Sequence, residues 1–380
     1  MVLVTALLAG VCLAGCLYLV LAAAAVRGFA RAPAMPSAPP IPATILKPLH
    51  GEDGQLYDSL RSFCVQRHPC FQIIFGVRDP ADPAIAIVRR LIAELPERDL
   101  ALVIDPSVSG SNFKVSNLEN MMPLAKHDVL VIADSDMRVG PDYLSAVTAA
   151  LADDDVGLVT CLYRGRPVAG RWSRFATMFV NHSFLPSALI GERLRPGDAC
   201  FGATMALRRD IYATIGGFAG LRDQLADDYA LGAAIRRAGK RVVLSPQLVD
   251  TTMADADLRS LVAHELRWSR TIRMIAPAGF AASVITHPLA LALLATIALG
   301  FPPIMIAVLA IVLMVRLAAV RVIDRALALP ATPLWLVPLR DLLSFSVFIA
   351  SFLSNRVAWR DRKFRIAADG RLVTIGDSRA

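Results

Sequence analysis

The stretch Asp128-Val-Leu-Val-Ile-Ala-Asp-Ser-Asp136 joins an apolar run to two carboxylates that stand two positions apart. A short apolar run bounded by polar residues predicts a buried strand over residues 128–133. Alternate side chains of an extended chain point the same way, so Asp134 and Asp136 can reach one hard cation. A pair of solvated turn aspartates is the alternative interpretation. A strand placed before the pair favours a metal site at the carboxyl edge of a sheet.

Around this strand, short apolar runs alternate with helical patterns. Strands that alternate with helices predict an α/β domain with a doubly wound parallel sheet, whose ligands bind beyond the carboxyl ends of the strands. The predicted strands are residues 43–46, 72–77, 100–104, 128–133, 156–160, 203–207 and 242–244. The predicted helices are residues 55–65, 84–95, 114–126, 141–151, 171–189, 227–238 and 258–274.

Composition places this domain in a membrane protein. Of the 380 residues, 55% are hydrophobic and only 19% are charged, whereas soluble domains are about 25% charged. Uncharged runs at residues 2–26 and 274–315 are long enough to cross a bilayer once and twice. Disordered chains, collagens and small disulfide scaffolds are thereby excluded. The predicted domains are an N-terminal transmembrane anchor (1–31), a Pro-rich linker (32–43), the α/β domain (44–273), a C-terminal transmembrane region (274–355) and a basic tail (356–380).

Charges next to the apolar runs predict the orientation. Arg27 and Arg31 follow the first run, which has no basic segment before it and is therefore read as a retained anchor rather than a signal peptide. The positive-inside rule then places the α/β domain in the cytoplasm. Two further spans are expected at residues 281–300 and 304–320. Residues 335–353 are apolar but include Arg340 and Asp341, so a full span and an interfacial or re-entrant segment both stay open.

Charge and cysteine patterns exclude two other classes of site. The net charge is +8, but no block of basic residues alternates with aromatic residues, so we expect no nucleic-acid partner. Basic residues beside the apolar runs indicate an anionic bilayer surface instead. The six cysteines form no CxxC pair, which favours free thiols in a reducing compartment over a zinc or redox site.

Two other clusters carry candidate chemistry. Asp227 and Asp228 open a predicted helix, where they are either capping residues or include a general base that takes a proton from an alcohol. Near residue 270, Arg267, Arg270 and Arg273 are spaced to share one helix face, and Trp268 lies among them. Such a stripe can bind a diphosphate, or it can be a juxtamembrane positive cluster with an interfacial tryptophan.

The ordered motifs ILKPL, VRDPADPAI, KVSNLENMM, ADSDMRV, ADDY and a closing RW resemble the ceramide glucosyltransferases and their bacterial relatives in hopanoid-lipid biosynthesis. The resemblance runs from about residue 45 to residue 273, with membrane segments at both ends. It implies the GT-A inverting glycosyltransferase superfamily, and so a GT-A-type doubly wound mixed sheet flanked by transmembrane helices. His264 departs from the family pattern, which has Gln or Arg at that position, and Asp227 stands where Glu is usual.

The resemblance also implies residue roles. Asp228 matches the catalytic base, and Asp134 and Asp136 match the ligands of a Mg²⁺ or Mn²⁺ ion that holds the donor diphosphate. Matches to substrate-binding positions are Lys47, Asp79, Lys114, His182, Arg267 and Trp268. His182 and Cys200 resemble residues beside the family's active site, although packed core residues are an equal alternative for both. A turn role is the alternative for Lys47 and Asp79, since Asp-Pro pairs start turns.

The activity implied by the resemblance is inverting transfer of a sugar from UDP-GlcNAc or UDP-glucose to a hydroxyl of a membrane lipid. Only five of the 40 basic residues are lysines, a bias typical of GC-rich bacterial genomes, so the expected location is a bacterial inner membrane and the expected acceptor a hopanoid polyol. The alternatives are a ceramide glucosyltransferase, a processive polysaccharide synthase and a noncatalytic membrane lipid-binding protein.

Overall fold

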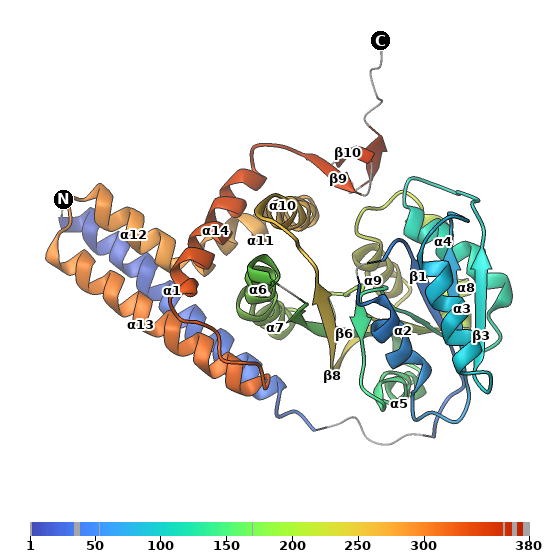
Figure 1. The fold of residues 1–380 in the computed structure, drawn as a ribbon. Coiled ribbons are helices and arrows are strands. Elements are labelled where there is room, and N and C mark those ends of the chain that lie inside the picture. The colour runs from blue at the N-terminus through green and yellow to red at the C-terminus, as the bar shows by residue number, and fades with distance from the viewer. Residues whose placement is uncertain are drawn as a thin grey trace, which may run out of the picture. The chain divides into compact units, whose positions relative to one another are not determined.

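The computed structural model describes residues 2–33, 39–52, 54–168, 170–359, 362–366 and 371–374. Contacts divide the chain into two compact units, which Figure 1 traces in sequence colours. The first, called the helical unit below, comprises residues 1–32, 171–190 and 255–380. The second, called the sheet unit, comprises residues 33–170 and 191–254. The predicted domain boundaries stay a prediction.

The sheet unit is built on one eight-stranded sheet in the order β3-β2-β1-β4-β7-β6-β8-β5. Its strands are β1 (Ala43–Leu49), β2 (Phe71–Val77), β3 (Asp99–Ile104), β4 (Val129–Ile132), β5 (Met137–Arg138), β6 (Val156–Pro167), β7 (Met205–Arg208) and β8 (Arg241–Met253). The chain winds from β1 outward to β3 and then returns to place β4 on the other side of β1. A topological switch point therefore lies between β1 and β4.

The sheet is mixed, as the family resemblance implies. The alternation of strands and helices alone predicted a parallel sheet. The strands β3, β2, β1 and β4 run parallel, whereas β7 is antiparallel to both β4 and β6. At the far edge β6 and β8 are parallel, and β5 is antiparallel to β8. A doubly buried strand has the same apolar composition in either direction, so apolar runs alone do not specify the direction.

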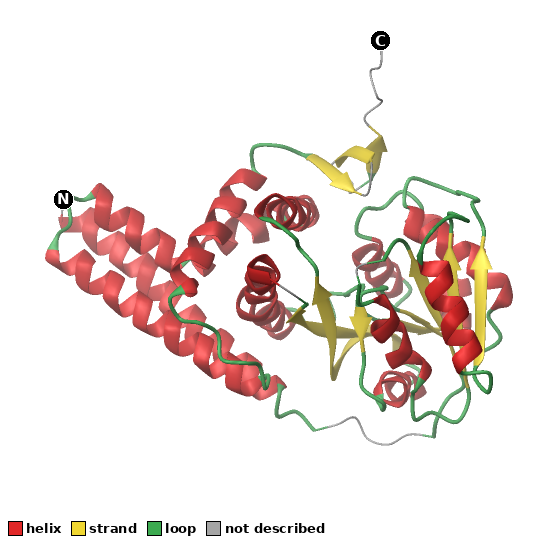
Figure 2. Cartoon of the chain, in the orientation of Figure 1, coloured by secondary structure: helices red, strands yellow, loops and turns green. Residues whose placement is uncertain are grey.

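Helices cover both faces of the sheet, which explains the unbroken apolar strands. Along β1, Ile45 packs with one hydrophobic cluster and Leu46 with the other, as alternate side chains must. The first cluster is completed by α2 (Leu56–Cys64), α3 (Ala84–Glu94) and α5 (Tyr143–Ala149). The second is completed by α4 (Phe113–Met121), α8 (Arg209–Thr214) and α9 (Asp227–Arg237). In Figure 2 the strands are yellow and these helices red.

Element boundaries differ most from expectation in the second half of the chain. The predicted strands 156–160 and 242–244 are only parts of β6 and β8, which pair over most of their length with an irregularity near Cys161. The predicted helix 171–189 is present as α6 (Gly170–Phe179) and α7 (Leu185–Leu194), joined by a π-helical turn η3 (Val180–Phe184). A π-turn keeps the same apolar pattern, so periodicity does not reveal it.

In the helical unit, α1 (Val2–Phe29) and α13 (Pro303–Ala326) are long and apolar enough to cross a membrane. A third span exists if α11 (Pro277–Ala282), η5 (Ser283–Thr286) and α12 (Pro288–Ala298) count as one, although they bend by 69°. His287 and Pro288 mark the bend, because proline interrupts the helical hydrogen bonds. The chain is therefore a membrane protein with two or three such helices among the residues described.

Two other helices of this unit, neither among those long and apolar enough to span, bear on the predictions. α10 (Leu258–Ile275) carries the closing RW pair, and α14 (Leu336–Ser351) is a 16-residue helix that buries Arg340. A full span and an interfacial or re-entrant segment at residues 335–353 both stay predictions. Beyond α14, the predicted basic tail contains a three-stranded antiparallel sheet of β9 (Arg356–Trp359), β10 (Arg362–Ile366) and β11 (Leu372–Thr374).

The spans α1 and α13 run in the same direction. Cys12 of α1 shares an apolar cluster with Met305 at the start of α13, whereas Ala22, further along α1, lines one cavity with Ile323 near the end of α13. The helices therefore place their basic ends, with Arg27 on α1 and Arg321 and Arg325 on α13, on the same side.

Candidate functional site

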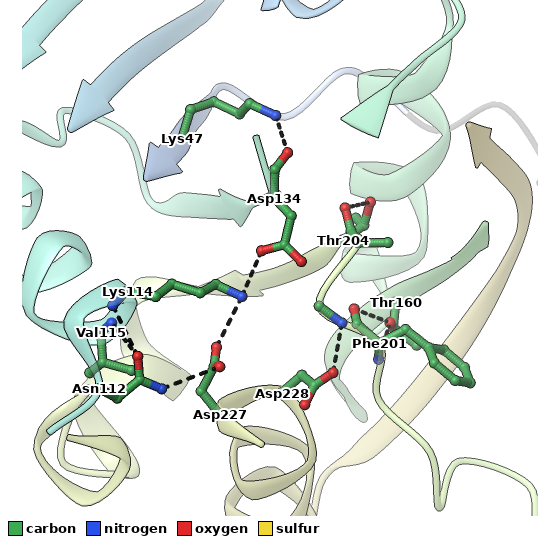
Figure 3. A network of polar contacts seen from close by, with 12 residues as sticks. Lys47, Asn112, Lys114, Val115, Asp134, Thr160, Phe201, Thr204, Asp227 and Asp228 are labelled. Carbon is green, nitrogen blue, oxygen red and sulfur yellow. Dashed lines mark hydrogen bonds and ion pairs between the residues drawn. The ribbon is translucent and has the colours of Figure 1, made fainter. Parts of the chain in front are cut away.

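The site in the sheet unit lies at the switch point between β1 and β4. Lys47 stands on β1, and Asp134 follows β4 directly. The Lys47 ammonium donates to the backbone carbonyl of Asp134 (Figure 3). It also lies 3.9 Å from the centroid of the Phe63 ring. Its side chain is fully buried, and burial lowers the pKa of Lys47 to about 7. Lys47 thus supports the loop that presents Asp134, while its predicted contact with a nucleotide stays a prediction.

A second lysine joins the acidic clusters that lie far apart in the sequence. The Lys114 ammonium is 2.7 Å from Asp134 Oδ1 and 3.1 Å from Asp227 Oδ2, as Figure 3 shows. Asn112 caps α4 by accepting from the backbone amides of Lys114 and Val115, and its side chain donates to Asp227 at 3.4 Å. The cap of α4 is therefore also the support of the start of α9.

Asp228 faces the same point as Asp134. Its Oδ2 accepts from the backbone amide of Gly202 at 2.9 Å, and its Oδ1 accepts from its neighbour's amide at 2.8 Å. A methyl group added at Gly202 would lie 3.1 Å from Asp134 Oδ2, 3.4 Å from Asp228 Oδ2 and 3.4 Å from the Lys114 ammonium. Two carboxylates and one ammonium thus converge on this glycine.

Gly202 reaches this edge because β7 runs against its neighbour. Met205, at the start of β7, pairs with Ile132, at the end of β4. Because β7 runs antiparallel to β4, the residues just before β7 lie beside the residues just after β4. Thr160 holds the loop by exchanging hydrogen bonds of 3.0 and 2.9 Å with the backbone of Phe201.

Asp136 completes the acidic pair in a protected position. Its Oδ2 accepts from the Thr251 hydroxyl at 2.7 Å, and its backbone carbonyl accepts from the Thr252 amide at 3.2 Å. Burial, and next the charge of Asp134, raise the pKa of the Asp136 carboxyl. A cation between the two carboxylates would relieve that repulsion.

The residues present fit a divalent cation only as part of its ligand set. Mg²⁺ and Mn²⁺ prefer carboxylate and phosphate oxygens, and Asp134 and Asp136 supply carboxylates. Across the described ranges, no three or more His, Cys, Asp or Glu side chains form a ready-made metal cluster. The remaining ligands would therefore have to come from a bound diphosphate and water, as is usual for Mg²⁺.

The pKa shifts of Asp228 and Lys114 indicate different roles for this carboxylate and this ammonium. Burial, followed by the charge of Asp227, raises the pKa of Asp228 from 3.8 to about 6. Burial opposes the charge of Lys114, but Asp134 and Asp227 outweigh it and raise the pKa of Lys114. At neutral pH the site thus combines a fixed cation with a carboxylate whose proton affinity suits general base work.

Asp79 takes a different local role. Its side chain is exposed and accepts from the Ala81 amide at 2.9 Å, which is the turn chemistry expected of an Asp-Pro start. The buried Asp82 accepts from the Gly51 and Ala84 amides and so ties the loop after β1 to the start of α3. The predicted nucleotide contact of Asp79 stays a prediction.

The remaining predicted residues belong to the helical unit. The Trp268 ring lies 4.3 Å from that of His264, 6.1 Å from Phe179 and 6.4 Å from Phe184. His182, in the π-turn, is buried and pairs with Asp324 through Nε2 at 2.7 Å. Arg267 lies one position before Trp268 on α10, and its predicted role at a diphosphate stays a prediction, as does that of His182.

Several site residues were missed at the level of sequence. Asn112, Thr251 and Gly202 belong to no predicted cluster. A glycine three residues ahead of the strand β7 was the only signal that could have indicated Gly202. Cys200, noted from the resemblance, is buried, and burial followed by Asp228 raises its thiol pKa.

This sheet and this edge define a GT-A-like glycosyltransferase fold. A solved mannosyltransferase from Pyrobaculum calidifontis, in complex with GDP-Man and Mn²⁺, superposes with a TM-score of 0.54 over 91% of this chain and 99% of its own, at 19% sequence identity. At that identity the likeness shows the fold alone.

The chain belongs to glycosyl transferase family 21, which it matches over residues 7–372. Ceramide glucosyltransferase 1 of Caenorhabditis elegans is 25% identical over 227 residues, which are 59% of this chain and 48% of that protein. Ceramide glucosyltransferase 3 of the same organism is 23% identical over 346 residues, 87% of this chain and 74% of its own length. The chain thus aligns with about half of the first relative.

Proposed function

We propose that this chain is an inverting glycosyltransferase that moves a sugar from a UDP-sugar, UDP-GlcNAc or UDP-glucose, to a hydroxyl of a membrane lipid. The observation that carries the proposal is the convergence of Asp134, Asp228 and Lys114 on Gly202. Membership of glycosyl transferase family 21 and the apolar helices support it.

In the proposed reaction Asp228 takes the proton of the acceptor hydroxyl as that oxygen attacks the anomeric carbon. The C–O bond to UDP breaks on the opposite face, so UDP leaves with the bonding electrons and the configuration inverts. One base and no carboxylate nucleophile are what a single displacement needs, by analogy with inverting glycosidases. The raised pKa of Asp228 makes its carboxylate basic enough to accept that proton near neutral pH.

Other groups of the site are proposed to stabilise the negative charge that develops on the leaving UDP. Asp134 and Asp136 would hold Mg²⁺ or Mn²⁺, which when bound neutralises charge on the departing diphosphate. Lys114 supplies a permanent cation beside Asp134. Arg267 and Trp268 are proposed, from the family resemblance, to close on the diphosphate and the sugar.

For the acceptor, the composition and the resemblance favour a hopanoid polyol in a bacterial inner membrane, with the sheet unit in the cytoplasm. The names of the relatives favour ceramide as a second candidate. A polysaccharide synthase would instead release polymer, and a noncatalytic lipid-binding protein would show no metal-dependent turnover.

The test uses purified full-length protein with both donors and both lipids, and mass spectrometry of the products. Asp228→Asn is expected to abolish transfer, a loss of at least about 10²-fold for a general base, while UDP still binds. Asp154→Asn is the matched control, because the Asp154 side chain is 93% exposed. Near-normal transfer by Asp228→Asn would refute the assignment of the base, and polymeric product would refute single-sugar transfer.

A further inference from the structure

The helical unit contains a cavity lined by both polar and apolar atoms, with room for about two water molecules. It is lined from both candidate spans, from the π-turn, from α7, from α14 and from the bend between η5 and α12. Lining residues used below are Tyr18, His182, Ser187, Arg316, Ala319 and Asp341. In a bilayer, irregular backbone and ionisable side chains are tolerated where they line such a cavity, and they mark substrate paths.

The charges at this cavity are paired with one another. Arg316 donates to both carboxylate oxygens of Asp341, at 2.8 and 2.7 Å, and also to the backbone carbonyl of His182 at 2.9 Å. A backbone carbonyl of the π-turn, that of His182, therefore accepts a hydrogen bond from Arg316 of the candidate span α13. Because Asp341 already satisfies Arg316, the walls present no net charge to an occupant.

Hydroxyl and imidazole groups remain to contact an occupant. The Ser187 hydroxyl donates to the Ser183 carbonyl at 2.7 Å and accepts from the Tyr18 hydroxyl at 2.6 Å, so each of the two oxygens keeps an acceptor site. His182 binds Asp324 through Nε2, while its buried Nδ1 has no partner within the described part of the chain. A buried imidazole nitrogen without a partner is costly, which favours a ligand or water that can bond to it.

The cavity lies toward the basic ends of the two parallel spans. Tyr18 precedes Arg27 by nine residues, about 13 Å along the helix. On α13, Arg316 precedes Arg321 and Arg325 at the same end. In a hydrocarbon core about 30 Å thick this depth is close to the middle of the bilayer, where a polar group of a lipid needs hydrogen-bonding partners within the protein.

We infer that this cavity binds one neutral hydroxyl of the lipid acceptor, other than the hydroxyl that receives the sugar. The inference rests on the proposed function and names where its second substrate is held. An anionic phospholipid head would have to take Arg316 from Asp341 and leave that carboxylate buried and unpaired, which is strongly unfavourable. Apolar lining such as Ala319 can contact the carbon atom that carries this hydroxyl.

The main test fills the cavity. Ala319→Phe places a ring in the lining, and Ala318→Phe is the matched control, because Ala318 is exposed on the same helix. The probe is the lipid, ceramide or hopanoid polyol, that the wild-type protein glycosylates. Ala319→Phe should raise the KM for that lipid at least tenfold, with UDP affinity and acceptor-free hydrolysis of the UDP-sugar unchanged. Ala318→Phe should leave all three unchanged.

A gentler variant covers the case in which Ala319→Phe does not fold. Tyr18→Phe removes one hydroxyl and keeps the ring, so the lipid KM should rise severalfold. A version of the probe lipid with a diazirine beside its hydroxyls should crosslink to peptides containing Tyr18 or Ser187.

The outcomes separate the two proposals. An unchanged lipid KM in folded Ala319→Phe and in Tyr18→Phe, or crosslinks confined to other peptides, overturns the cavity inference while transfer persists. Competition by phosphatidylglycerol that Ala319→Phe abolishes also overturns it, in favour of an anionic head group. If the wild type neither binds UDP nor glycosylates either lipid, the proposed function fails and the cavity inference falls with it.

Discussion

Gly202 shows how one residue without a side chain can decide whether a site exists. Its backbone amide binds Asp228, and the space where a Cβ would lie is shared by Asp134 and Lys114. Its φ is not among the positive values found at eight other glycines, so the requirement is for space rather than for backbone freedom.

We therefore predict that Gly202→Ala disturbs the site without unfolding the protein. The added methyl group would lie 3.1 Å from Asp134 Oδ2, closer than carbon and oxygen normally pack, and the carboxylate must move. UDP affinity in the presence of Mn²⁺ should fall about tenfold or more, measured by titration calorimetry. Gly220→Ala is the control, because nothing lies within 4 Å of its added methyl group. Equal UDP affinities for the two variants would contradict the prediction.

The two aspartates of the ADDY motif should also interact through their charges. The pKa of Asp228 is about 6, so kcat/KM should fall as the pH drops through that value and the base becomes protonated. The charge of Asp227 contributes to this raised pKa, so removing it lowers the pKa of Asp228.

Asp227→Asn should accordingly move the acidic limb of the kcat/KM profile to lower pH, whatever the loss in absolute rate. The measurement is the pH dependence of transfer by the wild type and the variant, with Asp154→Asn as the exposed control. A limb that stays in place or moves to higher pH would exclude this coupling.

Among elements, α10 and α14 are joined by a buried ion pair. The Arg340 guanidinium donates to Glu265 at 2.6 Å and to Ser344 at 3.1 Å. The side chains of Arg340 and Glu265 are only 1% and 4% exposed. Glu265 lies two positions before Arg267, so this pair anchors the helix that carries the RW motif.

Breaking the pair should destabilise the helical unit strongly. Arg340→Met leaves a buried carboxylate without a partner and should cost about 3 kcal/mol or more, whereas the double variant Arg340→Met/Glu265→Met should recover most of it. Thermal unfolding in detergent measures the effect. Arg67→Met is the control, since the Arg67–Asp142 pair is exposed and such pairs contribute less than about 1 kcal/mol. A double variant no more stable than Arg340→Met would argue against an isolated pair.

At the scale of the whole molecule, the orientation in the membrane can be read from one cysteine. Of the six cysteines, all within the described residues, Cys70 of the sheet unit is exposed and the other five are buried. If the sheet unit lies in the cytoplasm, as predicted, a membrane-impermeant maleimide should label Cys70 in inside-out vesicles. It should not label Cys70 in sealed right-side-out vesicles. Cys70→Ser should abolish the labelling in both. Labelling of sealed right-side-out vesicles would place the sheet unit outside the cytoplasm.

The sequence by itself determined the local elements and the identity of the chemical groups. Apolar runs too uniform for one solvated face predict strands buried on both faces, and β1, β2 and β4 lie where they were expected. The acidic residues after β4 and at the start of α9 could be selected because the first pair follows a buried strand and both clusters match ordered family motifs. The uncharged runs likewise predicted α1 and α13 as spans.

Only the tertiary structure decided which of these groups meet. The reversal of β7 brings Gly202 beside Asp134, and the cap at Asn112 brings Lys114 to Asp227. The π-turn and the bend at His287 likewise create a cavity that no motif indicates. Strand direction and helix irregularities leave hydrophobic periodicity unchanged, because that pattern records only burial. Contacts between distant segments depend on how the buried faces pack, which local sequence does not encode.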